Sequence, residues 1–204
     1  MKAPTMAISH TTTDKSIRIA LLEYLAETHS ASDTAIISEF ALSNCSARID
    51  IAVVNGEMHG YELKSDSDSL KRLAQQVEAY NLIFDRVTLV VGKKHLVESL
   101  SFIPDWWGIT VAKITSDTHN TLLLPIRHAR TNPSQDIRSI VNLLWKSEAV
   151  ELLKTYTNLD QGERMKKEIV CNNLIGKIEI KNLKKHVRYQ LFTRFTQTTW
   201  RSVV

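Results

Sequence analysis

The spacing of apolar residues predicts a helix first and a β-hairpin after it. Residues 15–26 carry apolar side chains at intervals of three and four, which is typical of a helix that buries one face. Residues 34–42 predict a second short helix, with Glu39 beside its apolar positions. Residues 47–65 hold two runs rich in β-branched and aromatic residues on either side of Asn55-Gly56, and this pattern predicts a hairpin.

Alternation along this hairpin assigns its side chains to two faces. The odd positions form an apolar face: Ile49, Ile51, Val53, Tyr61 and Leu63. The even positions form a charged face with small residues in its middle: Arg48, Asp50, Ala52, Gly60, Glu62 and Lys64. Directly paired residues share a face, so Asp50 opposes Glu62 only if paired numbers sum to 112. A two-residue turn would give 111, so we expect a three-residue loop 55–57 with a Gly bulge.

The remaining pattern predicts an α/β core followed by helices. A Ser- and Asp-rich segment precedes a predicted helix at 70–84, and the apolar run 86–92 predicts a strand buried on both faces. A short helix at 94–100 and a strand at 108–114 follow, and the polar stretch 115–133, with two prolines, predicts a connector or edge loop. Helical spacing then continues to the end. We therefore expect an α/β core at 1–133 and a basic helical region at 134–204.

Composition supports a globular protein outside the membrane. The chain has 204 residues, of which 43% are hydrophobic, and no apolar run approaches the roughly 20 residues of a membrane helix. The N-terminus has no apolar stretch of the kind that signal peptides need, and Cys45 and Cys171 show no metal or disulfide spacing. These features predict a cytoplasmic protein with no membrane partner.

Positive charge is concentrated near the C-terminus. Residues 1–133 hold 13 Lys and Arg against 15 Asp and Glu, whereas residues 134–204 hold 13 against 7. Four of these basic residues share one stripe of a predicted helix: Lys181, Lys184, Lys185 and Arg188. Such a basic ridge is typical of a surface that binds a nucleic-acid backbone, and it is equally typical of a solvated helix face.

The candidate chemistry lies on the charged face of the hairpin. Two carboxylates, Asp50 and Glu62, would repel each other there unless a cation binds between them, and Mg²⁺ accepts such oxygen ligands while it also contacts phosphate. Lys64 could hold or deprotonate an attacking water. A cross-strand salt bridge would explain the same residues. Glu39 upstream and Gln76 downstream favour a site, because polar groups would then converge from three elements.

The order Glu39, Asp50, Glu62-x-Lys64, Gln76 resembles the PD-(D/E)XK nuclease superfamily, and the HGYELKSD block is similar to a bacterial family within it. The resemblance covers about residues 15–114 and departs from the name-giving motif in having Ile49-Asp50 instead of Pro-Asp. It implies a restriction-endonuclease-like αβββαβ core with a central mixed sheet.

The resemblance also implies residue roles in metal-dependent phosphodiester hydrolysis. Asp50 and Glu62 would bind Mg²⁺ or Mn²⁺, Lys64 would act on the water, Glu39 would be an auxiliary acid from a helix, and Gln76 would point back at the site. Arg48 shares the acidic face and could bind a phosphate or pair with an acid. DNA is favoured over RNA as the substrate. A structure-specific nuclease and a catalytically silent nucleic-acid-binding protein are alternatives, and the oligomeric state stays open, with a homodimer as one option.

Overall fold

A computed structural model describes residues 11–30, 32–42, 47–118, 120–157 and 162–201. These residues form a six-stranded mixed sheet in which the strands follow their chain order. The strands are β1 Ala35–Ala41, β2 Arg48–Val54, β3 Met58–Lys64, β4 Arg86–Gly92, β5 Gly108–Ile114 and β6 Thr121–Arg127. The pairs β3–β4 and β4–β5 are parallel, and the other three are antiparallel. The α/β fold class predicted from the sequence is therefore confirmed.

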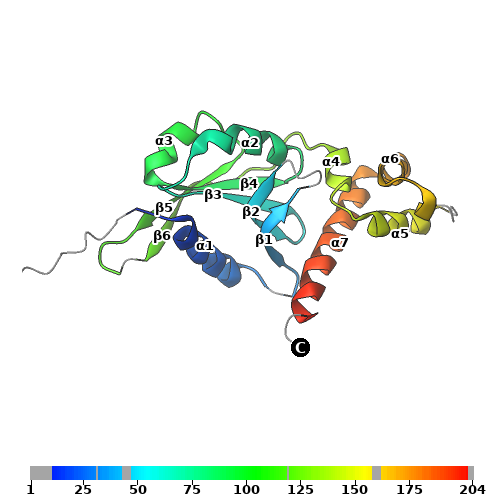
Figure 1. Cartoon of the computed structure of the whole chain (residues 1–204), viewed down its shortest axis with the longest axis horizontal. Helices are drawn as coiled ribbons and strands as arrows, with labels where there is room; N and C mark the ends of the chain where they lie inside the picture. The colour runs from blue at the N-terminus through cyan, green and yellow to red at the C-terminus, as the bar shows by residue number, and fades with distance from the viewer. Residues whose placement is uncertain (1–10, 31, 43–46, 119, 158–161, 202–204) are drawn as a thin grey trace, which may run out of the picture.

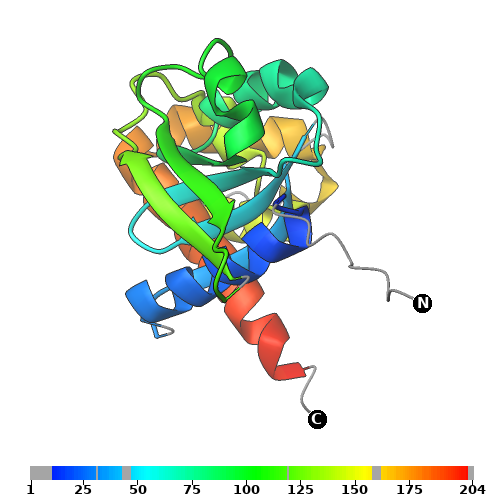
Figure 2. The ribbon, with the colours of Figure 1, turned by 90° about the vertical axis from the view of Figure 1, so that its left-hand side faces the viewer.

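Helices cover both faces of this sheet. The α-helices are α1 Asp14–Thr28, α2 Leu73–Asn81, α3 Leu96–Ser99, α4 Ile137–Val141, α5 Lys146–Tyr156, α6 Lys167–Lys177 and α7 Ile180–Arg201. Three short 3-10 helices accompany them: η1 Leu70–Arg72, η2 Lys93–His95 and η3 Gly162–Arg164. Figure 1 shows α1 on one side of the sheet, α2 and α3 on the other, and α4 to α7 beyond β1. In Figure 2 the edge formed by β5 and β6 faces the viewer. Among the described helices, none is long and apolar enough to cross a membrane.

Two hydrophobic cores lie on opposite faces of the sheet. The smaller core packs α1 against the odd positions of the hairpin, including Ile51, Tyr61 and Leu63. The larger core joins α2 and the other sheet face to residues of all four C-terminal α-helices. The predicted boundary near Ser134 thus falls just before helices that share a continuous core with the sheet.

Two segments form strands where the sequence predicted a helix and a loop. Residues 34–42, predicted as a short helix, contain β1, which pairs with β2 and buries Ile37 and Phe40. Residues 115–133, predicted as a connector, contain β6, which pairs only with β5. Pro125 is tolerated there because an edge strand can lack one backbone donor. In both cases sheet pairing outweighed the local pattern.

The predicted hairpin register is confirmed. In each of the four pairs from Ile51–Tyr61 to Val54–Met58, the two residue numbers sum to 112, and residues 55–57 form the connecting loop. The expected Gly bulge is absent, since no glycine of the described residues has a positive φ. The loop is closed instead by the backbone N–H of Asn55, which donates to the Glu57 carbonyl at 3.1 Å.

The alternation of β1 and β2 breaks at one paired position. Ile49 was predicted on the same face as Ile51, but it packs in the larger core together with Ala52, whereas Ile51 packs in the smaller core. Residues 49 and 52 differ by an odd number, so regular alternation would have placed them on opposite faces. Opposite this break lies Glu39, whose φ of 55° is a left-handed conformation that non-glycine residues rarely adopt. Both strands therefore bend at the position where Glu39 faces Asp50.

Candidate functional site

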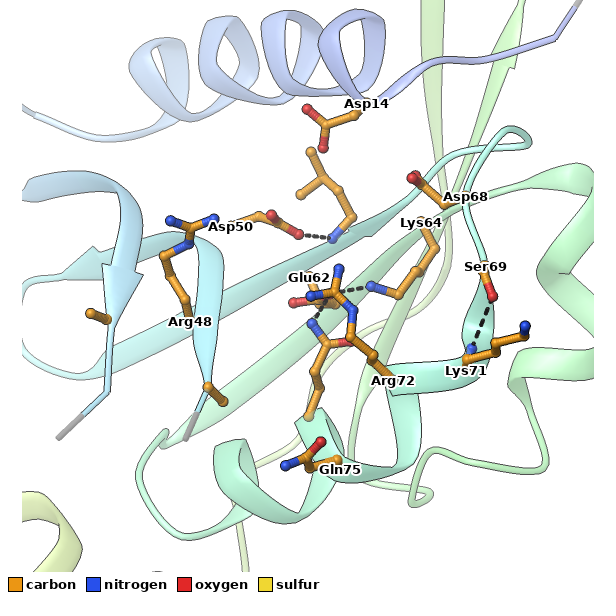
Figure 3. Close-up of a pocket in the computed structure, with 14 residues that line it drawn as sticks. Asp14, Arg48, Asp50, Glu62, Lys64, Asp68, Ser69, Lys71, Arg72 and Gln75 are labelled. Carbon is orange, nitrogen blue, oxygen red and sulfur yellow. Dashed lines mark hydrogen bonds and ion pairs between the residues drawn. The ribbon is translucent and has the colours of Figure 1, made fainter. Parts of the chain in front are cut away.

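A pocket of about 760 Å³ opens where β2 and β3 separate. Pairing between these two strands ends at Ile51–Tyr61, whereas β1 and β2 stay paired to Ala41–Arg48. The bend in β1 and β2 thus opens a fork in the sheet, and the pocket occupies it. Its lining is strongly polar and includes Asp14, Arg48, Asp50, Glu62, Lys64, Asp68, Lys71, Arg72 and Gln76 (Figure 3).

Asp50 lies at the fork itself. One carboxylate oxygen accepts the backbone N–H of Leu63 at 2.8 Å, in the place where a strand partner would otherwise accept it. The other oxygen is 3.1 Å from the guanidinium of Arg18, which reaches across from α1. Asp50 therefore reaches the site through the strand bend, and the simple alternation predicted for the hairpin does not continue to this residue.

Glu62 forms the floor of the pocket, and its side chain is only 1% exposed. One oxygen pairs with the Lys64 ammonium and accepts the Gln76 amide at 2.6 Å. The other oxygen accepts the Tyr80 hydroxyl at 2.7 Å. These donors come from β3 and α2, so a strand and the helix that covers it fix the orientation of this carboxylate.

Burial disfavours the charged form of both acids at the site. Burial, and next the charge of Asp50, raises the pKa of Glu62 to about 7, although Lys64 and Tyr80 oppose the shift. Burial also raises the pKa of Asp50 above its ordinary value, against the effects of Leu63, Lys64 and Arg18. A divalent cation between these two carboxylates would relieve both shifts.

Tyr80 and Gln76 support the floor of the pocket. Burial, followed by the charge of Glu62, raises the pKa of Tyr80, so its hydroxyl stays protonated and can donate. The ring stacks on the buried Trp107, with centroids 6.2 Å apart. The Gln76 Oε1 atom is buried and has no hydrogen-bond partner among the described residues, so an acceptor is left for a bound group.

Glu39 lies beside the site, but it is not on a helix as expected. From β1 its carboxylate binds Arg18 at 2.9 Å and Arg48 at 2.6 Å. Arg18 also binds Asp14 and Asp50, so one guanidinium joins acids from α1, β1 and β2. In this arrangement Glu39 holds arginines. Arg48 pairs with Glu39 and still lines the pocket, so both roles expected for it are compatible.

The basic ridge on α7 lies at the other end of the sheet. Arg188 binds Asp85 at 2.7 Å and the Gly56 carbonyl of the hairpin loop at 3.0 Å, and Lys184 donates to Gln135. The loop and the pocket are separated by the length of β3, about 20 Å for seven residues. The structure therefore does not bring this ridge to the pocket. Of its four residues, Lys181 and Lys185 are exposed, and Lys184 and Arg188 are partly buried.

Several residues in or beside the pocket escaped the sequence prediction. Arg18 and Asp14 sit on α1, far away in sequence, and no local pattern marks them. Lys71 and Arg72 carried a signal, since they lie in the first turn of a helical segment that starts after the Ser69 cap. Cations are disfavoured at that end of a helix by the macrodipole, so a Lys-Arg pair there suggests a role other than helix stability.

The donors suit a hard cation that keeps part of its water shell. Within the described residues, no cluster of three or more His, Cys, Asp and Glu side chains is arranged to hold a metal. Two carboxylates converge here, however, and a third oxygen is at hand. The N–H and C=O of one strand residue point to the same edge, so the Leu63 carbonyl points into the fork with its N–H. Mg²⁺ binds through one or two carboxylates and otherwise retains waters.

Comparisons with known proteins match the chain to one family. A family model described as "Bacteriophage P4 protein cII" matches residues 8–202. Protein cII of Enterobacteria phage P4 is 32% identical over 143 residues, which cover 70% of this chain and 53% of that protein. The chain thus spans about half the length of this curated relative. Among solved structures, a protein of unknown function from Silicibacter pomeroyi is 20% identical with a TM-score of 0.39, covering 61% of this chain and 80% of its own.

Proposed function

The chain belongs to the bacteriophage P4 protein cII family, and we propose that it is a metal-dependent nuclease that hydrolyses phosphodiester bonds in DNA in the cytoplasm. The observation that carries this proposal is the convergence of Asp50, Glu62 and Lys64 at the floor of one pocket. The resemblance to PD-(D/E)XK nucleases, including the αβββαβ order of α1 to β4, supports the same activity.

Asp50, Glu62 and the Leu63 carbonyl would hold Mg²⁺ or Mn²⁺. When bound, such an ion would polarise the scissile phosphate and offset the charge that develops on its oxygens. Tyr80 and Gln76 keep the Glu62 carboxylate in a fixed orientation, and Arg18 does the same for Asp50. These contacts reduce the reorganisation needed when substrate arrives.

Lys64 would act on the attacking water. Its ammonium now pairs with Glu62 and is almost fully buried. If a bound cation balanced the charge of Glu62, the Lys64 Nζ could turn toward a water beside the phosphate. There the ammonium would orient the water by donating a hydrogen bond, and it could accept the water's proton only as the neutral amine, after releasing one of its own.

One observation favours a second function. The Lys64 ammonium already pairs with Glu62, so this carboxylate has a positively charged partner without a metal. This closed pair suits a catalytically silent nucleic-acid-binding protein of the same fold. The two functions make different predictions, because a silent protein needs neither a divalent cation nor Lys64 for binding.

A cleavage assay with defined substrates tests the proposal. Purified protein is incubated with plasmid, linear and branched DNA and with RNA, in Mg²⁺, Mn²⁺ or EDTA. We expect cleavage of DNA in either metal and none in EDTA. Preferential cleavage of RNA or of branched DNA would move the substrate assignment to the alternative nucleases.

Two matched substitutions complete the assay. Glu62→Gln removes the charge of the proposed ligand, and Glu57→Gln removes a carboxylate from the loop end of the same hairpin, where it pairs with Arg86. Cleavage should be lost only in Glu62→Gln. Binding without cleavage in every metal, unchanged by Glu62→Gln, would instead establish the silent nucleic-acid-binding protein.

A further inference from the structure

The rim of the pocket carries cations on two opposite walls. Arg48 projects from the start of β2, with 64% of its side chain exposed. Lys71 and Arg72 project from η1 on the other side, and both are exposed (Figure 3). Among the described residues, no carboxylate forms an ion pair with Lys71 or Arg72. The rim can therefore bind an anion without breaking an ion pair on the η1 wall.

The reacting groups lie below this rim. Glu62 and Lys64 have side chains only 1% and 6% exposed, and Asp50 is 20% exposed. A phosphate that reaches them must descend between the two walls. A DNA duplex is stiff on the scale of this pocket, with a persistence length of about 150 base pairs, whereas a single strand can bend and bring one phosphate between the two walls.

We propose that the pocket takes a single strand of DNA, with Arg48 and the pair Lys71 and Arg72 binding the phosphates on either side of the one at the floor. This inference rests on the proposed function for the central phosphate. The rim residues would bind phosphates whether or not the DNA is cleaved. Their binding also does not involve the basic ridge on α7, which lies at the loop end of the sheet.

The placement of Lys71 and Arg72 supports this role. Cations in the first helical turn oppose the helix macrodipole, so they lower the stability of the segment that carries them. Both side chains are exposed at the mouth of the pocket, so a phosphate bound there would lie close to two positive charges.

Binding measured in EDTA tests the proposal without any cleavage. The probe is a fluorescently labelled single-stranded DNA oligonucleotide, and its anisotropy is followed over a range of salt concentrations. The double variant Lys71→Gln/Arg72→Gln is compared with Lys181→Gln/Lys185→Gln, which removes the same charge from exposed positions on α7. Each phosphate contact contributes about 0.7 to the slope of log affinity against log salt for a single strand.

We expect the rim variant to lose about 0.7 from this slope, for the one phosphate that the pair would bind, and the α7 variant to keep the wild-type value. Wild-type protein should bind the single strand more tightly than a blunt duplex of the same sequence or a single-stranded RNA. A loss confined to the α7 variant, or equal binding of duplex and single strand, would overturn the proposal. The expected slopes without cleavage in Mg²⁺ would uphold the rim contacts and reject the nuclease.

Discussion

The raised pKa of Glu62 predicts an unusual dependence of stability on pH. Its pKa is about 7 in the folded protein and takes the ordinary value of 4.5 once the chain unfolds. Between these values the folded protein holds a proton that the unfolded chain has lost. Stability therefore falls as pH rises through this window. The full loss is about 3.4 kcal/mol, since one pKa unit corresponds to about 1.36 kcal/mol.

Glu62→Gln isolates this contribution, because Gln has nearly the same shape and does not titrate. We expect the free energy of unfolding of the variant, relative to wild type, to rise by about 2.5 kcal/mol between pH 5 and pH 8. Carboxylates that do not interact with Glu62 titrate alike in both proteins and cancel in this difference. The assay is urea denaturation in EDTA, with Glu57→Gln as the control for the loss of a carboxylate from the same hairpin.

A divalent cation should reverse the effect. At pH 8, Mg²⁺ at 100 times its Kd should stabilise the wild-type protein by about 2.7 kcal/mol, because it binds only the folded state. The same addition should leave Glu62→Gln unchanged. A difference between wild type and variant that does not change with pH would refute the reasoning about Glu62. Equal stabilisation of both proteins by Mg²⁺ would refute its assignment as a ligand.

Three further predictions concern Lys64 and the strand geometry. Lys64→Ala should abolish cleavage while the anisotropy of bound DNA in EDTA stays near the wild-type value, and normal cleavage by this variant would exclude Glu-x-Lys as the active site. Glu39→Gly should have a free energy of unfolding about 1 kcal/mol higher than Glu39→Ala in urea denaturation, since both variants lose the ion pairs but only Gly relieves the strain of the positive φ. Equal stability of the two variants would argue against strain at this position. Gly60→Ala should cost about 1–3 kcal/mol in urea denaturation because its Cβ would lie 2.3 Å from Ile49 Cδ1, whereas Gly56→Ala meets no atom within 4 Å and should cost little.

Local pattern was sufficient for most elements of the fold. The strands Arg86–Gly92 and Gly108–Ile114 end where the apolar runs end, because strands buried on both faces admit few polar residues. The hairpin register was also predicted from the sequence, on the requirement that Asp50 and Glu62 share a face, although the regular pairing ends before these two residues.

Pairing partners decided the segments where the sequence prediction was wrong. The segment that forms β1 has apolar residues at spacings that fit a helix. A strand can bury the same residues because the bend at Glu39 shifts its alternation by one. A local pattern cannot distinguish this shift from helical periodicity. The second strand missed, β6, contains a proline and exists as a strand because β5 offers it a free edge.

The sequence by itself identified the residues of the proposed site: Asp50, Glu62 and Lys64 were singled out from residue type and spacing, since these depend on one hairpin. The tertiary structure decided how they meet. The fork between β2 and β3, the Arg18 contact from α1 and the cations at Lys71 and Arg72 all join elements distant along the chain. Such contacts depend on the packing of whole elements against each other, and local periodicity contains no information about that packing.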